Sequence, residues 1–251
     1  MFLRNLKFLF PVKNKLPIIF ENGSFLAINK PAGLLTIPDR HDGSLNSLYK
    51  ILQQQFKKIF IVHRLDKETS GLILFAKDEA THKYLSGLFE NKKIEKTYLG
   101  IIQGSVSEKS GTINEPIDEH PAHKGIMAVN KKGKPAQTDY EVLEDFGLFS
   151  LLKFHIHSGR THQIRVHMKH LGKPLAVDEL YGNGKPVLLS SFKKKYKLSL
   201  QEESERPILS RLALHSYQLK FKDAENKTFD LKAEMPKDMT ALLQQLRKVR
   251  G

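Results

Sequence analysis

Residues 63–71 read HRLDKETSG, and a short apolar segment that predicts a buried strand flanks them on each side. The charged residues therefore form a loop held between two strands, which is a common way to present an active site. Asp66 lies beside Arg64 and Lys67, and a neighbouring cation keeps a carboxylate ionised. Such a carboxylate acts as a nucleophile or stabilises developing charge. The residues alone equally allow Asp66 to cap a turn.

The elements expected outward from this loop are mostly strands. Strands are predicted at residues 18–20, 25–28, 59–62, 72–76, 96–103, 137–143, 149–156, 212–221 and 228–233. Helices are predicted at residues 44–58, 78–91, 160–171 and 238–249. Ser44 and Asp78 are the expected caps of the first two helices, and Asn22-Gly23 is a hairpin turn. Without a regular βαβ rhythm, this order favours an α+β fold with a mixed, mostly antiparallel sheet flanked by helices and loops.

The composition excludes several classes of site. The chain has 251 residues and no cysteine, which rules out disulfides, thiol catalysis, iron–sulfur clusters and Cys-ligated zinc. No apolar run approaches the roughly 20 residues that span a bilayer. Lys and Arg number 41 against 27 Asp and Glu, a net charge of +14. That excess indicates a polyanionic partner, with nucleic acid first and a membrane surface second.

The N-terminal residues 1–17 predict a short basic arm, followed by one domain over residues 18–251. The apolar run of the arm is broken by Arg4 and Lys7, and no small-residue cleavage site follows. We therefore expect a cytoplasmic protein without a membrane anchor.

Two further stretches, residues 120–138 and 185–201, carry several lysines and no acidic residue. The second stretch includes Lys193, Lys194 and Lys195 with aromatic residues interleaved. Solvated loops and RNA-contacting loops are equally compatible with this pattern.

A second polar segment, residues 157–170, reads HSGRTHQIRVHMKH. It places Arg160 at an expected helix start and His162 and Arg165 on nearby turns, so it offers donors and cations. Five histidines fall between residues 155 and 170, but His162 and His167 are five positions apart, not the four that bring two ligands together on a helix. The surrounding Arg and Lys residues would repel a cation, so no metal is expected. Phosphate-binding P-loop and G-x-S-x-G motifs are absent from the sequence.

Taken together, these segments resemble the RluA-type pseudouridine synthases. Five matches run in order along nearly the whole chain: NKPAGLLT at residues 29–36, HRLDKETSG at 63–71, KTY at 96–98, GRTHQIRVH at 159–167 and LH at 214–215. The chain departs from the family pattern at Val177, where a glycine is usual, and at Ser216, where alanine is common. Both departures are expected to be packing changes. The residues ahead of the first strand are too few for the S4 RNA-binding domain of many relatives, so RNA affinity is expected from the catalytic domain itself.

The resemblance implies a pseudouridine synthase fold and the isomerisation of uridine in RNA, without metal or cofactor. Asp66 would be the essential carboxylate, either attacking C1′ or removing a C2′ proton. Arg165 would pair with Asp66 and keep it ionised, and Tyr98 would lie against the uracil or help remove its C5 proton. Leu65 and Ile164 would dry the pocket.

The target base must leave its stack to reach Asp66, and by the same resemblance Arg64 would fill the space that it vacates. Arg160 and His162 are expected to contact RNA. An inactive RNA-binding protein on the same fold is the alternative, and a glycoside hydrolase is disfavoured because no second carboxylate is evident. Ribosomal RNA and tRNA both remain open as substrates. We expect a monomer with no obligatory protein partner.

Overall fold

The computed structural model describes residues 16–39, 42, 44–194, 196–197 and 204–250. The strands are β1 (Ile18–Glu21), β2 (Phe25–Lys30), β3 (Phe60–Ile61), β4 (Ser70–Ala76), β5 (Glu95–Gln103), β6 (Ser110–Ile113), β7 (Ile117–Glu119), β8 (Met127–Val129), β9 (Thr138–Asp145), β10 (Phe149–Ile156), β11 (Leu214–Lys222) and β12 (Thr228–Lys232). The helices are α1 (Leu48–Gln53), α2 (Glu79–Glu90), α3 (Gln163–His170), α4 (Lys237–Arg250) and a short 3₁₀ turn at Leu189–Ser191.

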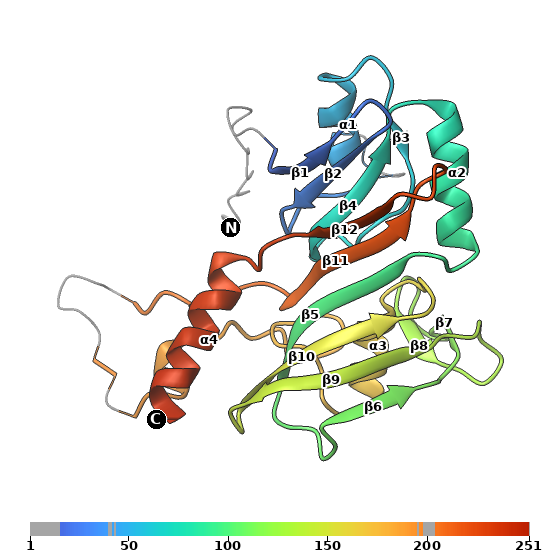
Figure 1. The fold of residues 1–251 in the computed structure, drawn as a ribbon. Helices are drawn as coiled ribbons and strands as arrows, with labels where there is room; N and C mark the ends of the chain where they lie inside the picture. The colour runs from blue at the N-terminus through green and yellow to red at the C-terminus, as the bar shows by residue number, and fades with distance from the viewer. Residues whose placement is uncertain (1–15, 40–41, 43, 195, 198–203, 251) are drawn as a thin grey trace.

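Ten of these strands form one sheet in the order β1-β2-β4-β11-β5-β10-β9-β6, with β12 paired to β11 and β3 paired to β4 (Figure 1). Only the β4–β11 pairing among the described strands is parallel, so the predicted mixed, mostly antiparallel sheet is confirmed. The short hairpin β7–β8 stands apart as a second sheet. No helix in the described part of the chain is long and apolar enough to cross a membrane.

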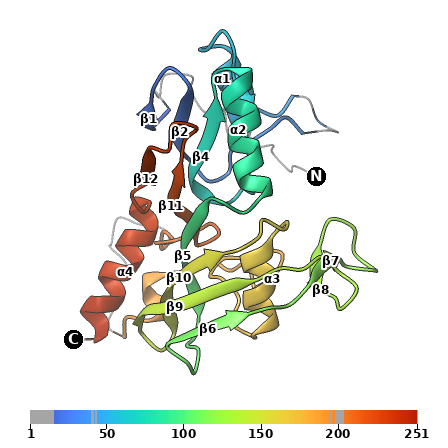
Figure 2. The same cartoon turned by 45° about the vertical axis from the view of Figure 1, so that its right-hand side comes forward.

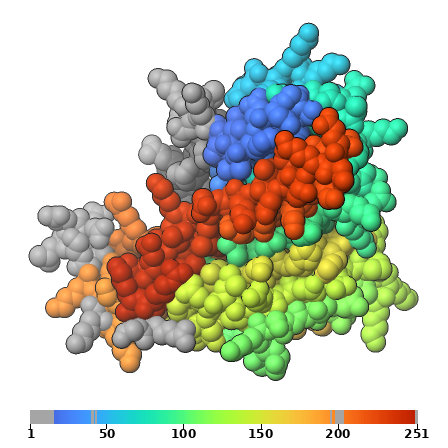
Figure 3. Space-filling model, in the orientation of Figure 1, coloured from blue at the N-terminus to red at the C-terminus, as the bar shows by residue number. Residues whose placement is uncertain are grey.

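The sheet has two halves that meet at β11. Figure 2 shows β1, β2 and β4 with α1 and α2 in the upper half, and β5, β10, β9 and β6 with α3 in the lower half. The space-filling view in Figure 3 shows the orange-to-red C-terminal segment running between the blue N-terminal strands and the yellow strands of the lower half. The late strand β11 therefore joins two regions that are formed earlier in the sequence.

The junction between β4 and β11 depends on a glycine. Gly71 pairs with Ser216 across it and has φ of +114°, in the region that side chains rarely adopt. A Cβ built on Gly71 would lie 2.2 Å from the backbone oxygen of Ser216. The close approach therefore requires a residue without a side chain at the end of the HRLDKETSG segment.

The helices cover both faces of the sheet. Alternation along β2 and β4 sends one set of side chains towards α1 and the other towards α2. In the lower half, α3 packs on the face that α1 covers, and α4 packs on the opposite face against Ile101 and Leu151. The candidate site opens on the face that carries α1 and α3.

Several expected element boundaries are wrong. The first helix begins at Leu48, and its cap is Ser47, not Ser44, because the Ser47 hydroxyl accepts the Lys50 N–H. The cap at Asp78 is confirmed. The helix expected from residue 160 begins at Gln163.

Strands β6, β7 and β8 were not predicted, and β8 falls inside the acid-free lysine stretch of residues 120–138. Residues 1–15 of the expected N-terminal arm lie outside the described residues.

Candidate active site

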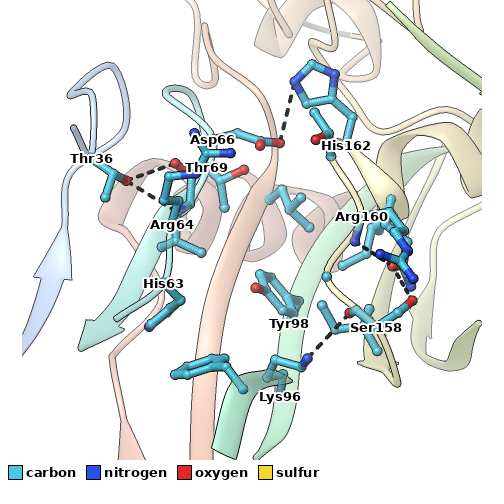
Figure 4. A pocket seen from close by; sticks show the side chains of 18 of the residues that line it. Thr36, His63, Arg64, Asp66, Thr69, Lys96, Tyr98, Ser158, Arg160 and His162 are labelled. Atoms are coloured by element: carbon cyan, nitrogen blue, oxygen red, sulfur yellow. Dashed lines mark hydrogen bonds and ion pairs between the residues drawn. The ribbon is translucent and has the colours of Figure 1, made fainter. Parts of the chain in front are cut away.

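A pocket of about 700 Å³ lies where the two halves of the sheet meet (Figure 4). Its walls come from the loop before β4, from β5, from the loop after β10 and from α3. The structure brings eight of the predicted site residues together around it: Arg64, Leu65, Asp66, Tyr98, Arg160, His162, Ile164 and Arg165. Lys193 and Lys194 do not line this pocket, and Lys195 lies outside the described residues.

The Asp66 loop is held by its backbone. The Thr36 hydroxyl donates to the Leu65 carbonyl at 2.9 Å and accepts the Leu65 N–H at 3.2 Å. The Lys67 carbonyl accepts from the Gly33 N–H at 2.9 Å and from the fully buried Lys30 ammonium at 3.0 Å. The NKPAGLLT segment thus fixes the main chain on both sides of Asp66 and leaves its carboxylate free to face the pocket.

The Asp66 carboxylate faces two basic side chains. Its Oδ2 lies 3.6 Å from Nη1 of Arg165 and 3.9 Å from Nε2 of His162. Among the described residues, no turn amide donates to this carboxylate, whereas the Asp66 carbonyl does accept the Thr69 N–H at 3.2 Å. The turn-capping alternative for the side chain therefore has no support in the geometry.

Arg165 has a tighter partner than the sequence suggested. Its Nε and Nη2 donate to the two carboxylate oxygens of Asp178, each at 2.8 Å. The expected pairing with Asp66 is thus the looser contact, because Asp178 is fully buried and takes the two-pronged face of the guanidinium. Burial lowers the pKa of Arg165, but the hydrogen bonds and charge of Asp178 raise it overall, so Arg165 remains a fixed cation.

Asp178 was missed as a site residue, although it directly follows Val177, where the sequence departs from the family pattern. Its Oδ1 also accepts the N–H groups of Leu180 and Tyr181 at 3.0 Å. The residue before it, Val177, has φ of +57°, which is strained for a β-branched residue. Val177 is a buried member of an apolar cluster, as expected of a packing change, and its backbone is in addition one that glycine would adopt without strain.

His162 is fixed by a tyrosine. Its Nδ1 lies 2.8 Å from the hydroxyl of buried Tyr181, which accepts the Met127 N–H at 2.9 Å. Burial lowers the pKa of His162, with Asp66 opposing that shift. His162 occupies the cap position of α3 with φ of +56°, which explains why the helix starts after it.

Tyr98 lies on β5 and is buried, with its side chain in the pocket. Burial raises the pKa of Tyr98, a hydrogen bond with Ser216 lowers it, and the charge of Asp66 raises it again. The net rise keeps the phenol protonated. The Ser216 hydroxyl donates to the Leu72 carbonyl at 3.0 Å, so Ser216 is a buried hydrogen-bonding residue of the junction and not only a packing change.

The remaining predicted residues form the walls. Leu65 and Ile164 are buried apolar residues, and Arg64 is exposed. Arg160 donates from Nε to the Pro135 carbonyl at 3.2 Å. Within the described part of the chain, no cluster of three or more His, Cys, Asp or Glu side chains has the geometry to hold a metal ion.

Comparison with known proteins places these residues in a family. A family model described as RNA pseudouridylate synthase matches residues 24–170. The chain is 38% identical over 240 residues to ribosomal large subunit pseudouridine synthase D of Nitrosomonas europaea, covering 93% of this chain and 66% of the relative. It is 39% identical to an uncharacterised RNA pseudouridine synthase of Bacillus subtilis, covering 71% of this chain and 61% of that protein. The chain thus spans less than two thirds of the length of both relatives.

A solved structure shares the fold. Human RNA pseudouridylate synthase domain containing 4 superposes with a TM-score of 0.72 at 24% identity, covering 92% of this chain and 93% of that one. The likeness extends over both halves of the sheet.

Proposed function

The chain belongs to the RNA pseudouridylate synthase family, and we propose that it isomerises uridines in structured RNA to pseudouridine. The observation that carries the proposal is the Asp66 carboxylate, which faces the pocket between Arg165 and His162 while its loop is held by backbone hydrogen bonds. A carboxylate in that position can act on a sugar carbon, because its contacts to the two basic side chains are long and its oxygens face the pocket.

The proposed reaction breaks the C1′–N1 bond of uridine and forms a C1′–C5 bond. The bonding electrons leave with the uracil, which makes C1′ electron-deficient. Asp66 can relieve this deficiency in two ways. Asp66 either forms an ester with C1′ or takes the C2′ proton to give a glycal. The uracil then turns and C5 forms the bond to C1′; this step displaces the Asp66 carboxylate from the ester or, from the glycal, is accompanied by return of the proton from Asp66 to C2′. C5 then loses its proton and N1 gains one, so the product is an isomer of uridine. No group or electron enters or leaves, so atoms and charge balance without a co-reactant.

In this proposal the other pocket residues orient Asp66 and the uracil and exclude water from the pocket. Arg165, held by Asp178, presents a permanent cation to Asp66. Tyr98 provides a protonated aromatic surface for the uracil, which favours stacking over proton removal in the free enzyme. Buried Leu65 and Ile164 exclude water and so strengthen the charge interactions. In this proposal Arg64, an exposed residue of the pocket lining, fills the gap left by a flipped base.

Large-subunit ribosomal RNA is the substrate that we propose first, with tRNA second, because of the relative of Nitrosomonas europaea. A net charge of +14 supports a polyanionic substrate. Arg160 and His162 at the pocket, and Lys193 and Lys194 away from it, are the proposed RNA contacts. If four to six phosphates are neutralised, the log–log salt slope of binding is about −3 to −5.

The test incubates the purified protein with unmodified large-subunit rRNA and, separately, with unmodified tRNA, and maps pseudouridine. We expect one or a few uridines to be converted in one of the two RNAs, and no conversion by Asp66→Asn. Tight binding of either RNA without conversion would support the inactive RNA-binding alternative. If the protein neither converts nor binds either RNA, the proposal is contradicted altogether.

A further inference from the structure

Lys96 is a pocket residue to which the proposed reaction assigns no role. It lies two positions before Tyr98 on β5, so both side chains leave the same face of the strand. Both residues line the pocket, and Lys96 is only 6% exposed. Figure 4 shows its side chain beside Tyr98, on the side away from Asp66.

The Lys96 ammonium has few partners for a buried cation. Its Nζ donates one long hydrogen bond, 3.4 Å, to the Ser158 carbonyl, although an ammonium has three protons to donate. Burial lowers the pKa of Lys96 and nearby Lys92 lowers it further, with no acidic group of the described residues opposing them. A buried cation without an anion destabilises a fold. Two of the three donors of Lys96 therefore have no hydrogen-bond partner among the described residues, and neither Asp66 nor Glu90 of the pocket lining forms an ion pair with it.

The position of Lys96 relative to Asp66 and Tyr98 indicates which atom it meets. This step rests on the proposed function, which puts the sugar carbon at Asp66 and the uracil ring over Tyr98. In uracil, C4 and its oxygen O4 lie across the ring from N1, at the end farthest from the sugar. Two residues along a strand span about 7 Å. A base that extends from Asp66 past Tyr98 thus points O4 towards Lys96.

We propose that Lys96 donates a hydrogen bond to O4 of the target uracil and stabilises the negative charge that the base gains when the C1′–N1 bond breaks. The electron pair of that bond is delocalised onto the carbonyl oxygens of the leaving uracil, and Lys96 keeps all its protons. A preorganised cation at the atom where charge develops lowers the barrier in both mechanisms open to Asp66. Cytosine carries an amino donor at that position, so the same ammonium disfavours it.

A binding experiment tests the contact without relying on turnover. Dissociation constants for uridine and for its 4-deoxy analogue, which lacks O4, are measured by NMR titration with wild type, Lys96→Met and Lys93→Met. Lys93 is an exposed lysine just before β5 that does not line the pocket. We expect wild type and Lys93→Met to prefer uridine about tenfold, and Lys96→Met to show no preference. Absence of the preference in wild type, or its persistence in Lys96→Met, would overturn the proposal.

Stability and rate separate this role from a structural one. Methionine matches the length of the lysine stem without its charge, so Lys96→Met is expected to melt no lower than wild type. Its single-turnover rate on the converted RNA should fall about 100-fold, whereas its RNA affinity should fall by no more than the factor of about ten that the contact to O4 contributes. A lowered melting temperature together with lost preference would make Lys96 structural and overturn the proposal. If wild type converts no RNA, the proposed function fails, but the nucleoside preference still decides the role of Lys96.

Discussion

The two sides of the pocket are held by different forces. The Asp66 loop is fixed by hydrogen bonds to its main chain, from the Thr36 hydroxyl and the Gly33 N–H among others. Arg165 is instead fixed through its side chain, by two charged hydrogen bonds to fully buried Asp178. The Asp66 side chain can therefore change without loss of the fold, whereas Arg165 and Asp178 depend on each other.

The largest loss of activity is expected at Asp66, whose loop is held by hydrogen bonds to its main chain. Asp66→Asn should abolish pseudouridine formation, because an amide is a poor nucleophile and a poor base. The free energy of unfolding should change by no more than about 1 kcal/mol, since the contacts of Asp66 to Arg165 and His162 are long and partly exposed.

Pseudouridine mapping, a urea titration and an RNA-binding curve on the same Asp66→Asn preparation check this prediction. Activity within about tenfold of wild type, a barrier change of only ~1.4 kcal/mol, would remove Asp66 from the mechanism.

At Asp178 we expect a large loss of stability, in contrast to Asp66, where the loss is of activity. Asp178→Asn leaves Arg165 as a buried charge without its anion and should lower the free energy of unfolding by about 3–5 kcal/mol. Urea unfolding measures the loss, with exposed Asp118→Asn as a matched control that should stay within about 0.5 kcal/mol.

Replacing the whole pair, Asp178→Leu with Arg165→Met, should recover most of that stability while remaining inactive. A loss below about 1 kcal/mol in Asp178→Asn would show that the Arg165 side of the pocket depends no more on its charged pair than the Asp66 loop depends on the Asp66 side chain.

Arg165→Lys separates the charge of Arg165 from its geometry, because it keeps the positive charge and removes the paired hydrogen bonds to Asp178. A lysine cannot satisfy both oxygens of Asp178 while facing Asp66. The single-turnover rate should fall at least about tenfold more than the RNA affinity.

Arg247→Lys is the control for Arg165→Lys: Arg247 also donates two hydrogen bonds to one carboxylate, that of Glu144, but far from the pocket lining. Equal losses of rate and affinity in Arg165→Lys would make Arg165 an RNA-backbone contact.

The smallest effect is expected at the junction between the two sides. Ser216→Ala removes the hydrogen bond to the Leu72 carbonyl and the one that reaches Tyr98. Stability should fall by about 1 kcal/mol, and the rate should stay within about threefold of wild type. Thermal melts and single-turnover assays measure both quantities. A rate loss near that of Arg165→Lys would instead give Ser216 a part in the chemistry.

The sequence predicted most of the sheet and the residues around the pocket, for local reasons. Local sequence patterns located β10 at its observed bounds, the hairpin turn at Asn22-Gly23 and the helix cap at Asp78, since these depend on neighbours in the chain. The strands β6, β7 and β8 were missed because they are short and half exposed, with little alternation to read.

The partner of Arg165 was missed for a different reason. Asp178 follows a turn 13 positions along the chain, and only the fold shows that it returns under the guanidinium. Val177 likewise looks like an ordinary apolar residue in the sequence, because backbone strain has no periodic signal. The sequence showed Lys96 only as part of a matched motif. Its burial without a neighbouring anion depends on contacts between distant segments, which the sequence does not reveal.

The place of β11 in the sheet sets the order in which the protein can mature. This strand lies between β4 and β5, and Ser70 meets His215 there although the two are 145 positions apart in the chain. During synthesis, β4 and β5 are made long before the strand that joins them, so each keeps an unpaired edge until the ribosome has passed residue 222. The pocket is accordingly one of the last parts of the molecule to assemble. A nascent chain that stalls before β11 exposes the unpaired edges of β4 and β5, which can aggregate, and has no complete catalytic centre.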